Sequence, residues 1–184
     1  GLGTAILTPQ DPLQALDDLA QQVQAAGIQA VRGDVVIDDR LFTPFRVPNQ
    51  NLLITPIVVN ENLVDVIVTP TAAGEAATVE WRPQTAAFGV KDEVMTSAAG
   101  SAADVTRSGN GKVTCVGTDG CSGEVSGEIP ADYRAPLSGE PTLVQTFQIE
   151  DPSAFARTVF IEALQRAGIQ VNAPLVGEND TSRL

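Results

Sequence analysis

The sequence has 184 residues, of which 43% are hydrophobic, and its 23 acidic against 11 basic side chains give a formal net charge of −12. This length suits one domain of ordinary size or two small ones, and no apolar run approaches the roughly 18 residues of a membrane span. Nucleic acid is not an expected partner, because no cluster of Lys or Arg is present to displace counterions from phosphates. The sequence contains no His, which excludes a Ser-His-Asp triad and removes the commonest metal ligand.

The first predicted element is an amphipathic helix that begins near Asp11. Asp11 and Pro12 predict the N-cap and the first helical position, where a proline loses no hydrogen bond. Apolar residues then recur at helical spacing, and Gly27 suits the left-handed position that follows a helix. A short buried strand is expected soon afterwards, at residues 35–37.

A second segment, residues 151–177, repeats this plan. It also opens with Asp-Pro, continues as a helix with an apolar stripe and ends in Ala-Gly-Ile-Gln, with Gly168 at the position of Gly27. A short apolar segment follows it as well. Two helix–strand units of the same design indicate an internal pseudo-repeat and predict a small α/β layer.

The residues between the two units have the character of β-strands. Stretches rich in β-branched and apolar residues lie between turn signals. These stretches are residues 62–70, 77–81, 111–116, 123–130 and 143–149. The expected fold class is therefore α+β. We expect a small α/β domain, made of residues 1–71 and 139–184, that is interrupted by a β-rich inserted domain of residues 72–138.

The two cysteines, Cys115 and Cys121, lie in the Gly-rich segment CVGTDGC. A zinc site would need two further nitrogen or sulfur ligands, and no His can supply them. A local disulfide that closes a hairpin is the favoured interpretation, and it would indicate an oxidising compartment. The alternative is a pair of reduced structural thiols.

No complete catalytic constellation is present in the sequence. A serine nucleophile without histidine usually relies on a lysine three residues later, yet neither Lys91 nor Lys112 follows a serine at that spacing. The Ser-x-Asn match at residues 108–110 is followed by glycine, and Asn-Gly predicts a turn. Asp38 and Asp39 are adjacent and should point to opposite faces of an extended segment, which places them poorly to share a proton. We therefore expect no catalytic residue, no metal and no cofactor.

The order of these pieces resembles that of one protein family. The pattern LxxLAxxVxxAGI leads into GDVVIDDRLF, and NENLVDVIVTP follows. A β-rich stretch ending in SGEIP then precedes a helix that opens with DP and ends in ALxxAGIQV. This ordered set is similar to the class C low-molecular-mass penicillin-binding proteins, which are D-alanyl-D-alanine carboxypeptidases and endopeptidases that trim peptidoglycan stem peptides. The resemblance covers nearly the whole chain.

The resemblance implies that the chain is the non-catalytic middle of such an enzyme. In that family a second domain interrupts the penicillin-recognising domain and is itself interrupted by a β-rich third. The family's Ser-x-x-Lys lies before these insertions, and its Ser-x-Asn and Lys-Thr-Gly lie after them. None has a counterpart at the right place here, so the chain alone is expected neither to bind penicillin covalently nor to hydrolyse a peptide. Its ends, at Gly1 and Leu184, fit an excised piece.

The resemblance also implies two substrate-binding residues, Asp38 and Phe42. In the family, an acidic residue and an aromatic residue after the GDVVID-like strand help to hold the amino end of the substrate's diamino acid side chain. A carboxylate suits an ammonium group at such a place. The alternative interpretation makes Asp38 a turn residue at a strand end and Phe42 a core residue. The implied partner is a peptidoglycan peptide, bound by way of the parent enzyme.

Two further hypotheses remain open on the sequence. In the first, the chain is a free-standing extracytoplasmic binding or structural module without an enzymatic parent. In the second, it is a self-contained hydrolase that uses acidic residues such as Asp38 and Asp39. The resemblance and the cysteine pair together predict an extracytoplasmic location, in the periplasm or at the cell surface. The sequence indicates no oligomeric state.

Overall fold

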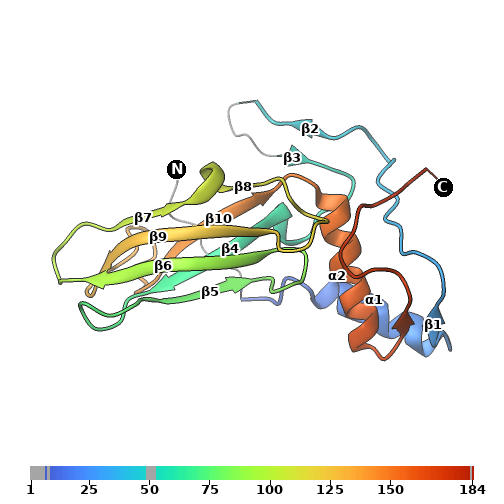
Figure 1. Ribbon diagram of the computed structural model, residues 1–184, viewed down its shortest axis with the longest axis horizontal. Helices are drawn as coiled ribbons and strands as arrows, with labels where there is room; N and C mark the ends of the chain where they lie inside the picture. Colours follow the sequence, from blue (N-terminus) through green and yellow to red (C-terminus); the bar gives the residue numbers. More distant parts are fainter. Residues whose placement is uncertain (1–6, 8, 49–52, 183) are drawn as a thin grey trace.

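The computed structural model describes residues 7, 9–48, 53–182 and 184. The described chain is elongated, with a pair of α-helices at one end and the two larger of its β-sheets in the remainder (Figure 1). The helices are α1 (Gln14–Ala25) and α2 (Pro152–Arg166). The strands, in chain order, are β1 (Ala30–Val31), β2 (Phe45–Arg46), β3 (Leu53–Ile54), β4 (Leu63–Thr69), β5 (Thr78–Arg82), β6 (Gly89–Ser97), β7 (Asp104–Arg107), β8 (Lys112–Val113), β9 (Ser122–Pro130), β10 (Leu143–Ile149) and β11 (Gln170–Val171). The mixture of helices and sheets confirms the predicted α+β class.

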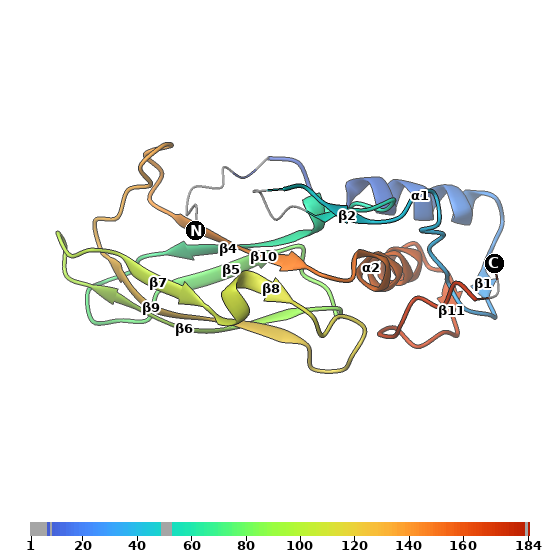
Figure 2. The ribbon, with the colours of Figure 1, turned by 90° about the horizontal axis from the view of Figure 1, so that it is seen from above.

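The two larger sheets differ in strand order and direction. The four-stranded sheet has the order β5-β4-β10-β8, in which β4 is antiparallel to β5 and β10, and β8 is parallel to β10. The three-stranded sheet has the order β6-β9-β7, with β6 parallel and β7 antiparallel to β9. The view from above shows the two sheets as stacked layers (Figure 2). Their inner faces and the first half of α2 contribute to one hydrophobic core.

The contact between the two sheets is close at one aromatic pair. The rings of Phe88, just before β6, and Phe147, in β10, lie 5.3 Å apart with their planes tilted by 60°. Gly123, in β9, faces this pair, and a Cβ atom placed there would come within 2.5 Å of the Phe147 ring. A side chain at this position would collide with both rings, so a glycine is required where β9 passes them.

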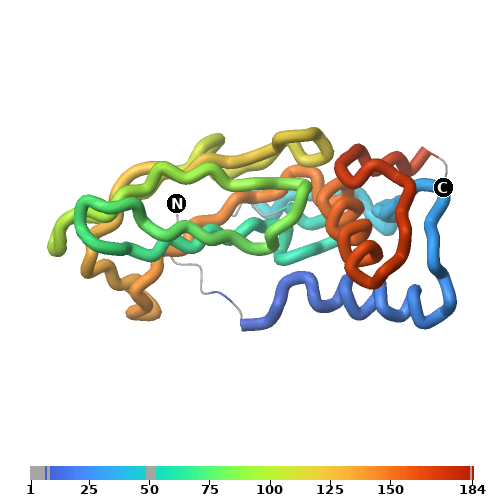
Figure 3. Tube along the Cα trace, turned by 60° about the horizontal axis from the view of Figure 1, so that its bottom comes forward, coloured from blue at the N-terminus to red at the C-terminus, as the bar shows by residue number. Residues whose placement is uncertain are grey.

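The two helix–strand units lie together at the other end of the molecule. Helix α1 packs beside α2 (Figure 3), and the short strands that follow them, β1 and β11, pair in parallel. Gly27 and Gly168 both adopt positive φ, +86° and +84°, at the position that follows each helix. The predicted pseudo-repeat and its left-handed glycines are therefore present in the structure.

Two expectations about the first unit were wrong. Helix α1 begins at Gln14, and the Asp11 carboxylate accepts a hydrogen bond from the Leu13 backbone N–H (2.8 Å) in a turn before the helix. The expected strand at residues 35–37 is an irregular extended segment, and the strand of this unit is β1. The reason lies in the partner of Ile37: its backbone N–H and C=O bond the side-chain amide of Asn179, at 2.8 and 2.9 Å, instead of a neighbouring strand.

The strands predicted in the middle of the chain are all present, as β4, β5, β8, β9 and β10. Strands β6 and β7 were missed, because the charged run KDEV and the small polar residues around residue 104 hide their alternation. The four-stranded sheet includes strands from both sides of residues 71 and 139. The division into residues 1–71 with 139–184 and residues 72–138 stays a prediction, and hydrogen bonds between strands cross its borders.

Cys115 and Cys121 form a disulfide, with their Cα atoms 5.3 Å apart. The expectation that this bond would close a hairpin was wrong, because β8 before the loop and β9 after it belong to different sheets. The bond therefore tightens the connection between the two sheets. A closed loop of this length stabilises the fold by about 2 kcal/mol on the chain-entropy model.

Candidate functional site

The candidate site is the exposed segment from Asp38 to Phe45, which links the helix–strand layer to strand β2. The chain leaves β1, passes α2 and reaches β2, which lies above α2 in Figure 1. The segment has no strand partner until Phe45 pairs with Ile54. Its side chains, rather than a sheet, therefore determine how it is held.

Asp38 and Arg40 form a two-pronged ion pair on this segment. The Arg40 Nε and Nη2 atoms donate to Oδ1 and Oδ2 of Asp38, at 2.8 and 3.0 Å, and the Arg40 backbone N–H also donates to Oδ1 at 3.2 Å. These hydrogen bonds from Arg40 lower the pKa of Asp38 from 3.8 to about 2. The same pairing raises the pKa of Arg40. Asp38 is thus a charged carboxylate at every physiological pH.

Two phenylalanines and a leucine form an apolar surface beside this pair. The rings of Phe42 and Phe45 lie 6.4 Å apart with a tilt of 54°, and Leu41 is 82% exposed. Phe42 itself is 39% exposed, so the alternative that makes it a core residue is wrong. The other half of that alternative, in which Asp38 is a turn residue, agrees with its hydrogen bond to the Arg40 backbone. The substrate-binding role of Asp38 and Phe42 stays a prediction.

A surface cavity of about 490 Å³ lies at this segment and is lined by Asp38, Arg40 and Leu41. Its walls provide a carboxylate, a guanidinium and an apolar side chain. A carboxylate accepts at about four positions, and Arg40 occupies part of this capacity. The remaining lone pairs can accept hydrogen bonds from an ammonium group of a ligand, with methylene groups against the apolar surface.

The neighbouring carboxylate, Asp39, has a separate partner. Its Oδ2 accepts a hydrogen bond of 2.6 Å from the Ser153 hydroxyl, in the first turn of α2. Asp38 and Asp39 therefore hydrogen-bond different groups, as expected for neighbours on an extended segment. This arrangement does not favour the hypothesis of a hydrolase in which the two aspartates act together.

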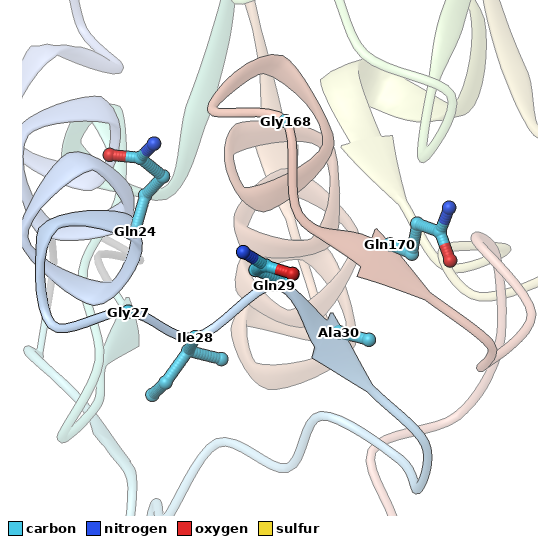
Figure 4. A pocket seen from close by; sticks show the side chains of 7 residues that line it. All are labelled: Gln24, Gly27, Ile28, Gln29, Ala30, Gly168 and Gln170. Carbon is cyan, nitrogen blue, oxygen red and sulfur yellow. The ribbon is translucent and has the colours of Figure 1, made fainter.

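A second hollow lies where the two helices end. It measures about 470 Å³ and is lined by Gln24, Gly27, Ile28, Gln29, Ala30, Gly168 and Gln170. The side chains of Gln24, Gln29 and Gln170 point in different directions and do not converge on one position (Figure 4). None of the lining residues is charged, so this hollow offers no acid–base chemistry.

The structure places the Ser-x-Asn match away from both hollows. Residues 108–110 form a turn between β7 and β8, in which Gly109 and Asn110 have φ of +58° and +53°. The turn predicted from Asn-Gly is therefore confirmed. Among the described residues, no group of three or more His, Cys, Asp and Glu side chains is arranged to hold a metal ion. None of the helices in the described ranges is both long and apolar enough to cross a membrane.

Two residues that contact the candidate aspartates, Arg40 and Ser153, were not predicted from the sequence. Arg40 follows Asp38 by two residues, a spacing at which an aspartate commonly caps the backbone of a turn, so this contact had a sequence signal. Ser153 is 114 residues from Asp39, and only the tertiary fold brings them together.

Solved structures with a similar fold are found among penicillin-binding proteins. Two crystal structures of penicillin-binding protein 4 from Haemophilus influenzae match this fold, one of them a complex with a β-lactam. Their TM-scores are 0.54 and 0.58, at 17% and 18% sequence identity, over 94% and 92% of this chain. The match covers 36% and 38% of those chains. The fold is therefore one that occurs within penicillin-binding proteins.

The family follows from the sequence match. Residues 2–183 match the model of the D-Ala-D-Ala carboxypeptidase 3 (S13) family, and the chain belongs to this family. A curated relative, the D-alanyl-D-alanine carboxypeptidase of Actinomadura sp. (strain R39), is 29% identical over 187 residues, a match that covers 93% of this chain. The chain spans 31% of that relative's length. The resemblance to class C penicillin-binding proteins is thereby confirmed.

Proposed function

We propose that this chain is the non-catalytic accessory region of a larger serine-type D-Ala-D-Ala carboxypeptidase or endopeptidase that acts on peptidoglycan stem peptides. One observation carries the proposal: the chain matches a curated carboxypeptidase over almost its entire length but over only 31% of that enzyme. Its sequence also contains no Ser-x-x-Lys or Lys-Thr-Gly motif. The chemistry of hydrolysis would then belong to the remainder of the enzyme, and this region would shape the substrate cleft or dock to the cell wall.

Within this region, Asp38 and Phe42 are the proposed substrate contacts. The Asp38 carboxylate is exposed and charged, and the Phe42 and Phe45 rings lie on the same segment. A charged carboxylate beside an apolar surface complements a side chain that ends in an ammonium group after several methylene groups. The diamino acid of a peptidoglycan stem peptide has this chemistry.

We propose an extracytoplasmic location, in the periplasm or at the cell surface. The support is the disulfide between Cys115 and Cys121, because disulfides persist in oxidising compartments. A region that acts on peptidoglycan would also meet its substrate there.

Labelling with a fluorescent penicillin tests the division of labour. The full-length protein that contains this chain is expected to become covalently labelled. The 184-residue chain is expected to remain unlabelled at the same concentration. A labelled isolated chain would contradict the proposal. If the full-length protein is not labelled and contains no Ser-x-x-Lys motif, the result would instead support a free-standing binding or structural module.

The role of Asp38 is tested on the intact protein with two substrates. One is a D-Ala-D-Ala peptide whose diamino acid carries a free side-chain ammonium, and the other is the same peptide acetylated on that nitrogen. The ratio of kcat/KM for the free over the acetylated peptide measures the contribution of the ammonium. Replacement of Asp38 by Asn is expected to lower this ratio about tenfold, which corresponds to about 1.4 kcal/mol. An unchanged ratio would contradict the substrate-binding role.

A further inference from the structure

The segment that carries Asp38 is attached to helix α2 by side chains far away in the sequence. Three residues provide these attachments: Glu150, immediately before the helix cap, and Ser153 and Arg157, in the first half of α2. We call them the α2 anchor. Ser153 and Arg157 are four residues apart and therefore share one face of the helix.

Arg157 is the most unusual member, because its side chain is only 2% exposed. Its Nε and Nη2 atoms donate to Oδ1 of Asp34, at 3.1 and 2.5 Å. Nη2 also donates to the carbonyl of Pro174 (3.1 Å), and Nη1 donates to that of Leu175 (3.4 Å). One guanidinium thus joins helix α2 to the segments that follow both short strands, β1 and β11.

A buried guanidinium gives little net stability, because the loss of hydration offsets much of the attraction to its partner. Its fork of donors fixes geometry, however, because each donor requires an acceptor at a set direction. Arg157 is therefore better suited to define the position of Asp34 than to stabilise the fold. Asp34 lies four residues before Asp38 on the same extended segment.

The next two attachments hold the residues on either side of Asp38. The Asn179 side chain holds the backbone N–H and C=O of Ile37, and the Ser153 hydroxyl holds the carboxylate of Asp39. Neighbouring side chains of an extended chain point to opposite sides. Because the Asp39 side chain points toward α2, the Asp38 side chain points away from the helix into solvent. There it lines the surface cavity described above.

The far end of the segment is attached through Glu150. Its carboxylate bonds the Arg46 guanidinium and also lies 3.4 Å from the Lys112 Nζ atom of strand β8. This contact connects the end of the segment both to α2 and to the four-stranded sheet. The segment and the chain on either side of it are thus attached at Asp34, Asp39 and Arg46 to residues within eight positions of one another.

We propose that Ser153 and Arg157 are positioning residues that hold Asp38 in the orientation required to bind the ammonium group of the substrate. This inference rests on the proposed function of Asp38, and it assigns the orientation of that carboxylate to helix α2. Neither residue contacts the substrate. The consequence is that their removal weakens ammonium recognition while the catalytic step on a substrate without the ammonium is unaffected.

The test uses the intact protein and the ratio of kcat/KM for the free over the acetylated peptide. Replacement of Ser153 by Ala is expected to lower this ratio about threefold, the effect of one lost hydrogen bond. Replacement of Arg157 by Met, which retains most of the volume, is expected to lower it by about tenfold, because all the donors are lost. The kcat for the acetylated peptide is expected to stay unchanged in both variants, and Ser153→Thr, which keeps the hydroxyl, is expected to restore the ratio.

Arg166 offers a matched control on the same helix. It also pairs with an aspartate, Asp17, at 2.6 Å, but it lies at the other end of α2 and contacts α1. Replacement of Arg166 by Met is expected to leave the ratio unchanged. An equal loss in the Arg166 variant would assign the effect to general destabilisation and would overturn the inference.

The outcomes distinguish the substrate contact of Asp38 from the positioning role of Ser153 and Arg157. If Asp38→Asn lowers the ratio while Ser153→Ala and Arg157→Met do not, the positioning role is wrong and the substrate contact stands. If Asp38→Asn has no effect, the substrate contact is wrong and the positioning role is wrong with it. Should Arg157→Met fail to fold, Ser153→Ala still decides the question, because the loss of one oxygen atom from a half-buried side chain leaves no large cavity.

Discussion

The two helix–strand units share one sequence plan but differ in how deeply they are buried. Of the residues of α1, only Ala20 is buried, whereas ten residues of α2 are buried, among them Phe155, Val159 and Ile161. The isoleucine that follows each left-handed glycine shows the same contrast: Ile28 is 44% exposed and Ile169 is 2% exposed.

The difference comes from the place of each helix in the fold. Helix α2 packs against α1 and contributes buried residues both to the core of the sheets and to the core of the helix end, whereas α1 packs mainly against α2 (Figure 3). An amphipathic stripe is enough for an outer helix. Helix α2 also carries a buried charged residue, Arg157, which pairs with Asp34 on the chain that leads to the candidate site. Two helices with the same start and end signals therefore serve different tertiary roles.

The largest expected effect contrasts the cores of the two helices. Ile161→Ala removes a side chain that is 0% exposed, and we expect a loss of about 3 kcal/mol in the free energy of unfolding. Leu19→Ala, in α1, removes a side chain that is 45% exposed, and we expect a loss below about 1 kcal/mol. Chemical denaturation of both variants measures the difference, and equal losses would mean that α1 is as deeply packed as α2.

A smaller effect tests what the two units have in common. Gly27→Ala and Gly168→Ala each force an alanine into positive φ, while a Cβ atom at either position would meet no atom within 4 Å. We expect each variant to lose about 1 kcal/mol, because only backbone strain changes. Denaturation curves that differ clearly between the two would show that burial, not local conformation, sets the cost.

The smallest expected effect on the stability of the fold concerns the ion pair between Asp38 and Arg40, which follows the first helix–strand unit. Arg40→Ala removes the hydrogen bonds that hold the pKa of Asp38 at about 2, and we expect this pKa to rise toward 3.8. Since the folded-state pKa is lowered, any stabilisation from the pair is present above pH 4 and is lost as the pH falls toward 2. A carboxyl-carbon NMR titration measures the shift, with Lys91→Ala, on the distant strand β6, as the control. An Asp38 pKa that stays near 2 in Arg40→Ala would mean that another group holds the charge.

The candidate site was only partly visible in the sequence. The position of Asp38 and Phe42 followed from their motif, and the exposure of both agrees with a surface role, which stays a prediction. The ion pair with Arg40 is local and could have been expected from the spacing. The contacts from Ser153, Arg157 and Asn179 could not, because they join residues more than 110 positions apart. No local pattern encodes such a pairing.

The sequence by itself determined the elements whose signals are local. These are the two helices, the glycines that end them, the turn at residues 108–110 and the hydrophobic strands β4, β9 and β10. Only the tertiary structure decided that Ile37 bonds the Asn179 side chain instead of a strand, and that the disulfide joins two sheets. The physical reason is that backbone conformation depends on neighbours a few residues away. Burial and pairing depend on which distant surfaces exclude water together.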